Sequence, residues 1–296
     1  MSWGAAAARA SWPRPRGRPE VAFSQPQCRR ILGLLFRRVR YHVEGLAHVP
    51  ASGPALLVLN HTGWEEILVL ILALTRRTCF VALHELLHLD QRESWERLFT
   101  TSHFRRLGPL ARRLLMLLGR VFGGAWRAQL QAFGVIPVRV ADEHWRPRFS
   151  TNGVLAIMRA LSAGELVILF PEGGLNRAGT MKPFRPGLGA VLRLLARRGV
   201  QVPVLCAAQR CARAVTPLLG SRYPARVLIA PPVQVELDED PACDERLARA
   251  LQDRVAALLP ALYPMGLPQD YAARRPLPEG ASALALRGWP CAPQER

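Results

Sequence analysis

The sequence predicts a single α/β domain with a mainly parallel, twisted sheet flanked by helices. Short apolar runs rich in Val, Leu and Ile alternate with longer amphipathic runs, an order typical of such a sheet. With 296 residues and 50% hydrophobic composition, the chain is long enough to bury a full core. It shows no internal repeat that would divide this core.

Both ends of the chain differ in composition from the middle. Residues 1–27 are rich in Arg, Ala and Pro, and we expect a disordered tail there. Residues 263–296 are rich in Pro and Ala and are predicted to be a C-terminal tail. The α/β domain is therefore predicted over 28–262.

The predicted domain opens with a basic amphipathic helix in the segment 28–45. A helix of this kind either lies on a membrane surface or packs on the domain with a solvated basic side, and both interpretations stay open. Its apolar residues share one face between pairs of arginine: Ile31, Leu34, Leu35 and Val39.

The remaining elements follow from periodicity and from end signals. Ser150 or Thr151 can cap a helix that Gly164 ends, and Pro109 suits a first helical turn. Strands are expected over 54–60, 78–83, 133–140, 165–170, 200–208 and, as a pair or one bent strand, 225–235. Helices are expected over 65–75, 103–124, 150–164, 188–199 and 243–262.

The helix predicted over 103–124 also has two interpretations. Leucines fall on one side and arginines opposite. The first interpretation is a helix packed on the core with a solvated basic side, and the alternative is a helix that faces a membrane.

The charge of the chain is strongly positive. Forty basic residues, of which only Lys182 is a lysine, give a formal net charge of +18. Such a charge attracts nucleic acid, an anionic membrane or phosphorylated small molecules. Aromatic residues make up 7% of the chain and no recognition motif is evident, so we expect no nucleic-acid partner.

Membrane and redox signals are weak in the sequence. No apolar run reaches the ~18–20 residues that cross a bilayer, so we predict no transmembrane helix and a peripheral protein on the cytoplasmic face of a membrane. The six cysteines form no CxxC pair and are expected to be free thiols.

Two polar loops follow predicted strands, where parallel sheets bind ligands. The first, "NHTGWEE", contains His61, and histidine is the usual general base. Glu66 could return from the first helical turn to orient its ring, and Glu65 is the rival for this role. The second loop is "PEGGLNR", which follows the strand 165–170.

A second His–Glu group, "HELLH", matches the HExxH zinc pattern. On a helix, His84 and His88 could bind one metal while Glu85 activates water, which would make a zinc-dependent hydrolase. A catalytic zinc needs a third protein ligand, and positions 91 and 94 hold Gln and Ser. The other interpretation is a strand-to-helix junction with polar histidines.

Four segments resemble the glycerophospholipid acyltransferases, the 1-acylglycerol-3-phosphate acyltransferase-like family. "NHTGWEEILVL" resembles their N-H-x-S-x-x-D motif, with Glu66 in place of Asp, and "FPEGGLN" resembles F-P-E-G-T-R-S. "GVIPVRV" and "VPVLCAA" are similar to the second and fourth motifs. The order and spacing agree from about residue 40 to 235.

This resemblance implies an enzyme that moves a fatty acyl group from acyl-CoA or acyl-carrier protein to a hydroxyl of a lysophospholipid or related glycerolipid. His61 would be the general base and Glu66 its partner, with no cofactor and no metal. Leu175 and Val140 stand where the family has arginine. The acceptor would be held by a set of loop residues and nearby arginines: Glu172, Gly173, Arg139, Arg177 and Arg185. A non-catalytic basic membrane-binding protein is the remaining alternative.

Overall fold

The computed structural model describes residues 22–63, 65–101, 107–138, 151–174, 180–210, 225–235, 237, 240, 242–263 and 286–288. Structural statements below refer to these residues. Within them, the side chains of 65, 66, 101, 151 and 152 are not described.

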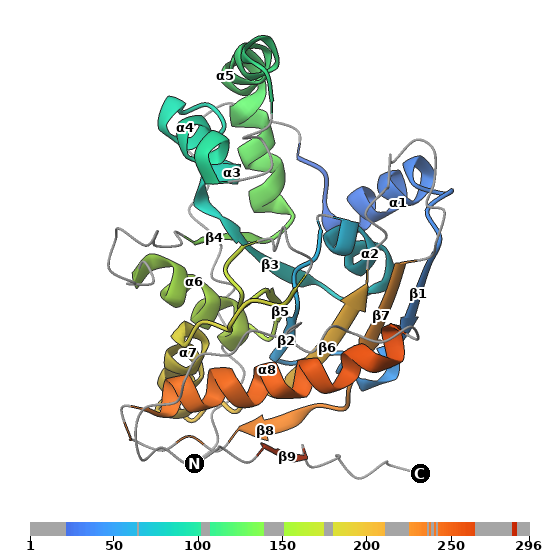
Figure 1. Ribbon diagram of the computed structural model, residues 1–296, viewed down its shortest axis with the longest axis vertical. Helices are drawn as coiled ribbons and strands as arrows, with labels where there is room; N and C mark the ends of the chain where they lie inside the picture. The colour runs from blue at the N-terminus through green and yellow to red at the C-terminus, as the bar shows by residue number, and fades with distance from the viewer. Residues whose placement is uncertain are drawn as a thin grey trace.

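A twisted sheet runs through the centre of the molecule, and helices cover both of its faces (Figure 1). Five neighbouring strands are parallel, β7 runs antiparallel to β6, and β1 runs parallel to β7. An antiparallel pair, β8 and β9, adds to β6. In spatial order the main strands are β1 (Tyr41–Glu44), β7 (Ala225–Ile229), β6 (Val204–Arg210), β2 (Ala55–Leu59), β5 (Leu166–Leu169), β3 (Thr78–Leu83) and β4 (Val135–Val138), with β8 at Val233–Val235 and β9 at Leu286–Gly288.

Alternate residues of the strands pack into two separate cores. On β2, Leu56 and Val58 face one core while Leu57 and Leu59 face the other. The first core is covered by α6, α7 and α8, and α8 crosses in front of β6 in Figure 1. The second is covered by α2 and α1. The helices are α1 (Gln25–Leu35), α2 (Glu65–Ala73), α3 (His84–Leu87), α4 (Arg92–Thr101), α5 (Pro109–Ala132), α6 (Thr151–Ser162), α7 (Gly187–Ala196) and α8 (Cys243–Leu262).

The predicted fold class is confirmed: a mainly parallel α/β sheet flanked by helices, with a basic helix at its start. Pro109 begins α5, and Gly164 follows α6 with φ of +79°, as expected. Strand β1 was not predicted, because Tyr41 and His42 of this edge strand are exposed and leave no alternating pattern.

The domain limits stay a prediction, although two described elements extend past them. Helix α1 begins at Gln25 rather than 28, because Ser24 and Gln27 form a capping box. Strand β9 lies inside the predicted tail 263–296 and pairs with β8. Backbone pairing at a sheet edge needs no apolar pattern, so the composition gave no sign of it.

The core-packed interpretation of the 103–124 segment is wrong for its leucine side. The apolar side of α5 is exposed, with Leu110 at 82% and Leu117 at 56% of full exposure. The opposite side packs on the chain through Gly119 and Gly123. In α1, likewise, Leu34 and Leu35 are exposed at 75% and 64%.

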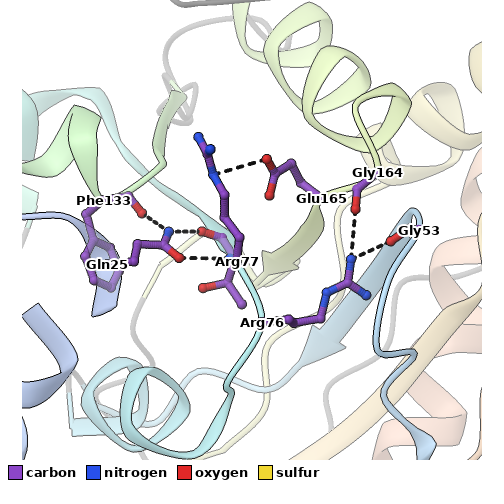
Figure 2. A network of polar contacts seen from close by, with 8 residues as sticks. Gln25, Gly53, Arg76, Arg77, Phe133, Gly164 and Glu165 are labelled. Atoms are coloured by element: carbon purple, nitrogen blue, oxygen red, sulfur yellow. Dashed lines mark hydrogen bonds and ion pairs between the residues drawn. The ribbon is translucent and has the colours of Figure 1, made fainter. Parts of the chain in front are cut away.

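The side chains of Gln25 and Arg76 donate hydrogen bonds to backbone carbonyls at the amino ends of several strands (Figure 2). The buried Gln25 amide donates to the carbonyls of Thr78 and Phe133 and accepts from the Thr78 N–H at 3.1 Å. Arg76 donates to the carbonyls of Gly53 and, at 2.8 Å, of Gly164. These contacts lie where β2, β3, β4 and β5 begin, so they hold the strand starts in place at the end opposite to the polar loops.

Candidate active site

The two predicted loops meet at the carboxyl edge of the sheet. β2 and β5 are parallel neighbours, with Val58 paired to Leu169. Carrying this register three residues further places His61 opposite Glu172. Two segments far apart in the sequence are therefore adjacent because their strands are.

Glu172 binds the backbone on both sides of this junction. Its side chain is buried, with 3% exposure. Oε1 accepts the His61 backbone N–H at 2.6 Å, and Oε2 accepts the Lys182 N–H at 2.8 Å. A buried carboxylate needs such donors, and charge-assisted hydrogen bonds of this kind are short and strong. Glu172 thus fixes the backbone position of His61.

The His61 ring lies against an aromatic neighbour. Its centroid is 4.3 Å from that of Phe170, with an interplanar angle of 28°. Phe170 is buried and follows β5 directly. The stack holds one face of the half-buried imidazole against an apolar surface. The hydrogen bond to Glu172 holds the backbone of the same residue.

A pair of amides ties the residue before His61 to the other neighbouring strand. Asn60 and Gln209 are both fully buried. Asn60 Nδ2 donates to the Gln209 carbonyl at 3.1 Å, and the Gln209 N–H donates to Asn60 Oδ1 at 2.9 Å. An amide side chain has both the donor and the acceptor that this contact requires. The segment 60–61 is therefore held by both β6 and the turn after β5.

The Pro-Glu-Gly turn brings Arg185 to the same place. Gly173 has φ of +71°, a left-handed conformation that favours glycine. A Cβ there would lie 2.4 Å from Arg185 Nε, so the arginine side chain crosses directly over the glycine. The Arg185 N–H also donates to the Pro171 carbonyl at 2.9 Å.

For the other predicted site residues, the structure describes only the backbone or does not include the residue. Glu66 is the second residue of α2, which begins at Glu65, but its side chain is not described. Arg139 and Arg177 lie outside the described residues. The pairing of His61 with Glu66 therefore stays a prediction.

Sequence reasoning missed two contacts of the site. The bond from Lys182 to Glu172 joins residues ten apart across a turn, and Gln209 meets Asn60 across 149 residues. Val58 and Leu169 are separated by the same number of residues as His61 and Glu172. This equal separation would have indicated that the two loops meet, but it has a meaning only once the pairing of β2 with β5 is known.

The "HELLH" segment forms a different arrangement at the end of β3. Helix α3 covers one turn, and His88 is its C-cap. The rings of His84 and His88 stack with centroids 4.1 Å apart. Glu85 is buried and pairs with Arg97 at 2.9 Å. Among the described residues, no group of three His, Cys, Asp or Glu side chains is placed to hold a metal.

Two buried cysteines are poor nucleophiles. Burial raises the pKa of Cys79 and of Cys206 to about 12, the latter against a smaller opposing effect of Arg254. The thiolate is the reactive form, so both thiols stay protonated near neutral pH.

The fold and the site together define an α/β protein that holds a histidine at the carboxyl edge of its sheet, beside a Pro-Glu-Gly turn. Residues 40–208 match the model of the family described as Acyltransferase, which is more than half of the chain. The protein belongs to this family and is an acyltransferase. The resemblance seen in its motifs is thereby confirmed at the level of the family.

One solved structure with a similar fold is the 1-acyl-sn-glycerophosphate (LPA) acyltransferase PlsC from Thermotoga maritima. It shares 15% sequence identity with this chain, with a TM-score of 0.48. The match covers 80% of this chain and 81% of that one. No curated protein matches the sequence.

Proposed function

We propose that this acyltransferase moves a fatty acyl group from acyl-CoA or acyl-carrier protein to a hydroxyl of a lysophospholipid or related glycerolipid. The hydrogen bond from the His61 N–H to Glu172 carries the proposal. It joins the two loops whose sequences resemble the first and third family motifs, and so it gives the resemblance a physical basis in this chain.

His61 is the general base in the proposed reaction. Its imidazole takes the proton of the acceptor hydroxyl as the oxygen attacks the thioester carbonyl. The C–O bond forms, the C–S bond breaks, and the imidazolium returns its proton to the leaving thiolate. Glu66 at the start of α2 orients the ring and stabilises the imidazolium.

The acceptor binds beside this base. Arg185 crosses Gly173 and offers guanidinium donors at the turn, and paired donors of this kind suit a phosphate group. Arg139 and Arg177 are proposed as further donors. Both Glu172 oxygens accept backbone N–H groups, so Glu172 contributes to binding through the shape of the loop that it holds.

The proposed reaction uses no cofactor and no metal, and the acyl thioester donor is a co-substrate. A lipid acceptor places the enzyme at a membrane surface, and we propose the cytoplasmic face. The positive charge favours an anionic leaflet, and nucleic acid is not a proposed partner.

Both alternatives have lost support. Glu85, the water-activating residue of the zinc hydrolase, is instead paired with Arg97. Membership of an enzyme family argues against a non-catalytic membrane-binding protein.

The test is a lipid mass-spectrometry comparison of cells that express the wild type and His61→Ala. We expect a glycerolipid with one additional acyl chain to accumulate with the wild type only, which would also name the acceptor. Equal accumulation with the variant, at equal amounts of folded protein, would refute the mechanism. Accumulation of a different acylated product would refute the acceptor class.

A further inference from the structure

Helix α5 exposes a continuous apolar surface. It is 24 residues long, and its exposed residues recur at the spacing of one helix face. Their exposure ranges from 42% to 82%, which is unusual for large apolar side chains in a row. We name this surface the α5 stripe: Leu110, Leu114, Leu117, Leu118, Val121 and Phe122.

The opposite side of α5 holds the helix in place. A Cβ at Gly119 would lie 2.2 Å from the Leu89 carbonyl oxygen, and one at Gly123 would lie 2.7 Å from the Asp90 nitrogen. Arg127 pairs with Asp90, and the indole N–H of Trp126 donates to the Leu86 carbonyl at 2.8 Å. Because the glycines allow close backbone contact on this side only, the stripe is fixed facing outward.

The charges on α5 indicate what covers the stripe. The helix contains four arginines and no acidic residue. Arg113 and Arg120 are exposed beside the stripe. Two copies packed through it would bring these arginines together without a carboxylate from either α5, which is unfavourable. An anionic lipid surface offers both phosphate groups for the arginines and acyl chains for the leucines.

The position of α5 suits a lipid acceptor. The chain leaves the carboxyl end of β3, passes through α3 and α4, and enters α5, and Figure 1 shows these three helices together at one end of the molecule. The carboxyl ends of parallel strands share one edge, and α5 packs through Gly119 and Gly123 on Leu89 and Asp90, which follow β3 and α3 on the side of the sheet that also carries His61. Among the described residues, no helix is long and apolar enough to cross a membrane.

We propose that α5 lies along an anionic membrane surface, with its stripe among the upper acyl chains and its exposed arginines at the phosphate groups. This rests on the proposed function, since a lipid acceptor is the reason for the enzyme to meet a bilayer. It goes further by assigning the contact to one face of one helix.

Vesicle co-sedimentation tests the assignment with the full chain. The vesicles are phosphatidylcholine with about one third phosphatidylserine, and pure phosphatidylcholine for comparison. We expect Leu117→Glu/Val121→Glu to lower the partition coefficient on anionic vesicles about tenfold or more. Arg113→Gln/Arg120→Gln should lower it about tenfold on anionic vesicles and leave it unchanged on neutral ones.

The matched control is Leu194→Glu, which makes the same change at an exposed leucine of α7, where 39% of the residue is accessible. It should bind vesicles as the wild type does. Equal binding by the stripe variant and the wild type would overturn the proposal. So would a wild-type dimer in light scattering that the stripe variant converts to a monomer, because a second copy would then cover the stripe.

Activity separates this proposal from the one on which it rests. With a short-chain lysolipid dispersed as monomers, the stripe variant should keep wild-type turnover. His61→Ala should bind vesicles normally and transfer no acyl group. If the wild type binds vesicles through the stripe but transfers no acyl group, the proposed function is refuted and the proposal that α5 binds a membrane is supported.

Discussion

Two His–Glu groups lie at the carboxyl edge of the same sheet and are built differently. After β2, the carboxylate that reaches His61 comes from the neighbouring strand end, and it binds backbone N–H groups. After β3, Glu85 pairs with the side chain of Arg97 on α4, while His84 and His88 stack on each other. The first arrangement joins the His61 backbone to a buried carboxylate, and the second is a one-turn helix whose carbonyls accept from Trp126 and Arg127 of α5.

The difference concerns how firmly the chain holds the histidine that we propose as the base. Both places combine histidine with glutamate close by in the sequence. What differs is how other parts of the chain hold the backbone: a buried carboxylate accepts the N–H of His61 itself, whereas at α3 the Trp126 indole donates to the carbonyl of Leu86. Asn60 and Glu172 hold the His61 segment through hydrogen bonds made out of contact with water. Such bonds are costly to leave unmade, so they stabilise this backbone conformation of residues 60 and 61.

The largest expected effect is the contrast between the two histidine groups. His61→Ala should lower kcat for acyl transfer about 10²–10⁴-fold, the usual contribution of a general base. His84→Ala/His88→Ala should stay within about threefold of wild type, because we propose no role for these rings in the chemistry. Steady-state kinetics with purified protein gives both values.

Metal removal is the control for this contrast. Dialysis against EDTA should leave transfer unchanged, and elemental analysis should find much less than one zinc per chain. A strong loss of activity on chelation, restored by zinc, would reverse the assignment of the two groups.

The next largest effect concerns the carboxylate partner of His61. Glu66→Gln should lower kcat about 100-fold or more, because the amide neither stabilises the imidazolium nor enforces its tautomer. Glu65→Gln, the same change one residue earlier, should stay within about threefold. If the two results are exchanged, Glu65 is the partner.

The third effect tests whether Glu172 positions His61 or only stabilises the local fold. Glu172→Gln turns one carboxylate oxygen into an N–H donor that faces a backbone N–H, so the free energy of unfolding should fall by about 1–3 kcal/mol. The misplaced His61 should also lower kcat, by about 100-fold, with little change in KM. Urea unfolding and kinetics measure these quantities.

Glu85→Gln is the matched change in the second group. Its partner Arg97 is 43% exposed, so the loss should be about 1 kcal/mol or less, with kcat per folded molecule unchanged. Equal effects of both variants on kcat would show that Glu172 has no special connection to His61.

The smallest expected effect is at Cys206, which lies in β6 beside β2. Burial raises its pKa to about 12. The thiol should therefore resist iodoacetamide in the folded protein at pH 8, and Cys206→Ala should keep kcat within about twofold, as expected of a thiol that only packs. Rapid alkylation with parallel loss of activity would show that the thiol takes part in the reaction.

Much of the fold could be predicted from local patterns. The strand 78–83 and the helix 243–262 have the predicted limits, because period and end signals agree there. Strands β1 and β9 could not be predicted, since each is a short sheet edge whose pairing depends on the backbone of a distant strand. The exposed side of α5 was also misjudged, because an apolar helix face looks the same whether the chain or something else covers it.

The sequence by itself determined the alternation of strands and helices, the two strand-end loops and the family resemblance they carry, since these depend on residues close together in the chain. Only the tertiary structure decided that Glu172 lies opposite His61, that Glu85 pairs with Arg97, and that the α5 stripe faces outward. The reason is physical: strand register and helix packing bring together residues from different elements, more than a hundred positions apart for His61 and Glu172, and burial in one place rather than another decides which carboxylate binds which partner.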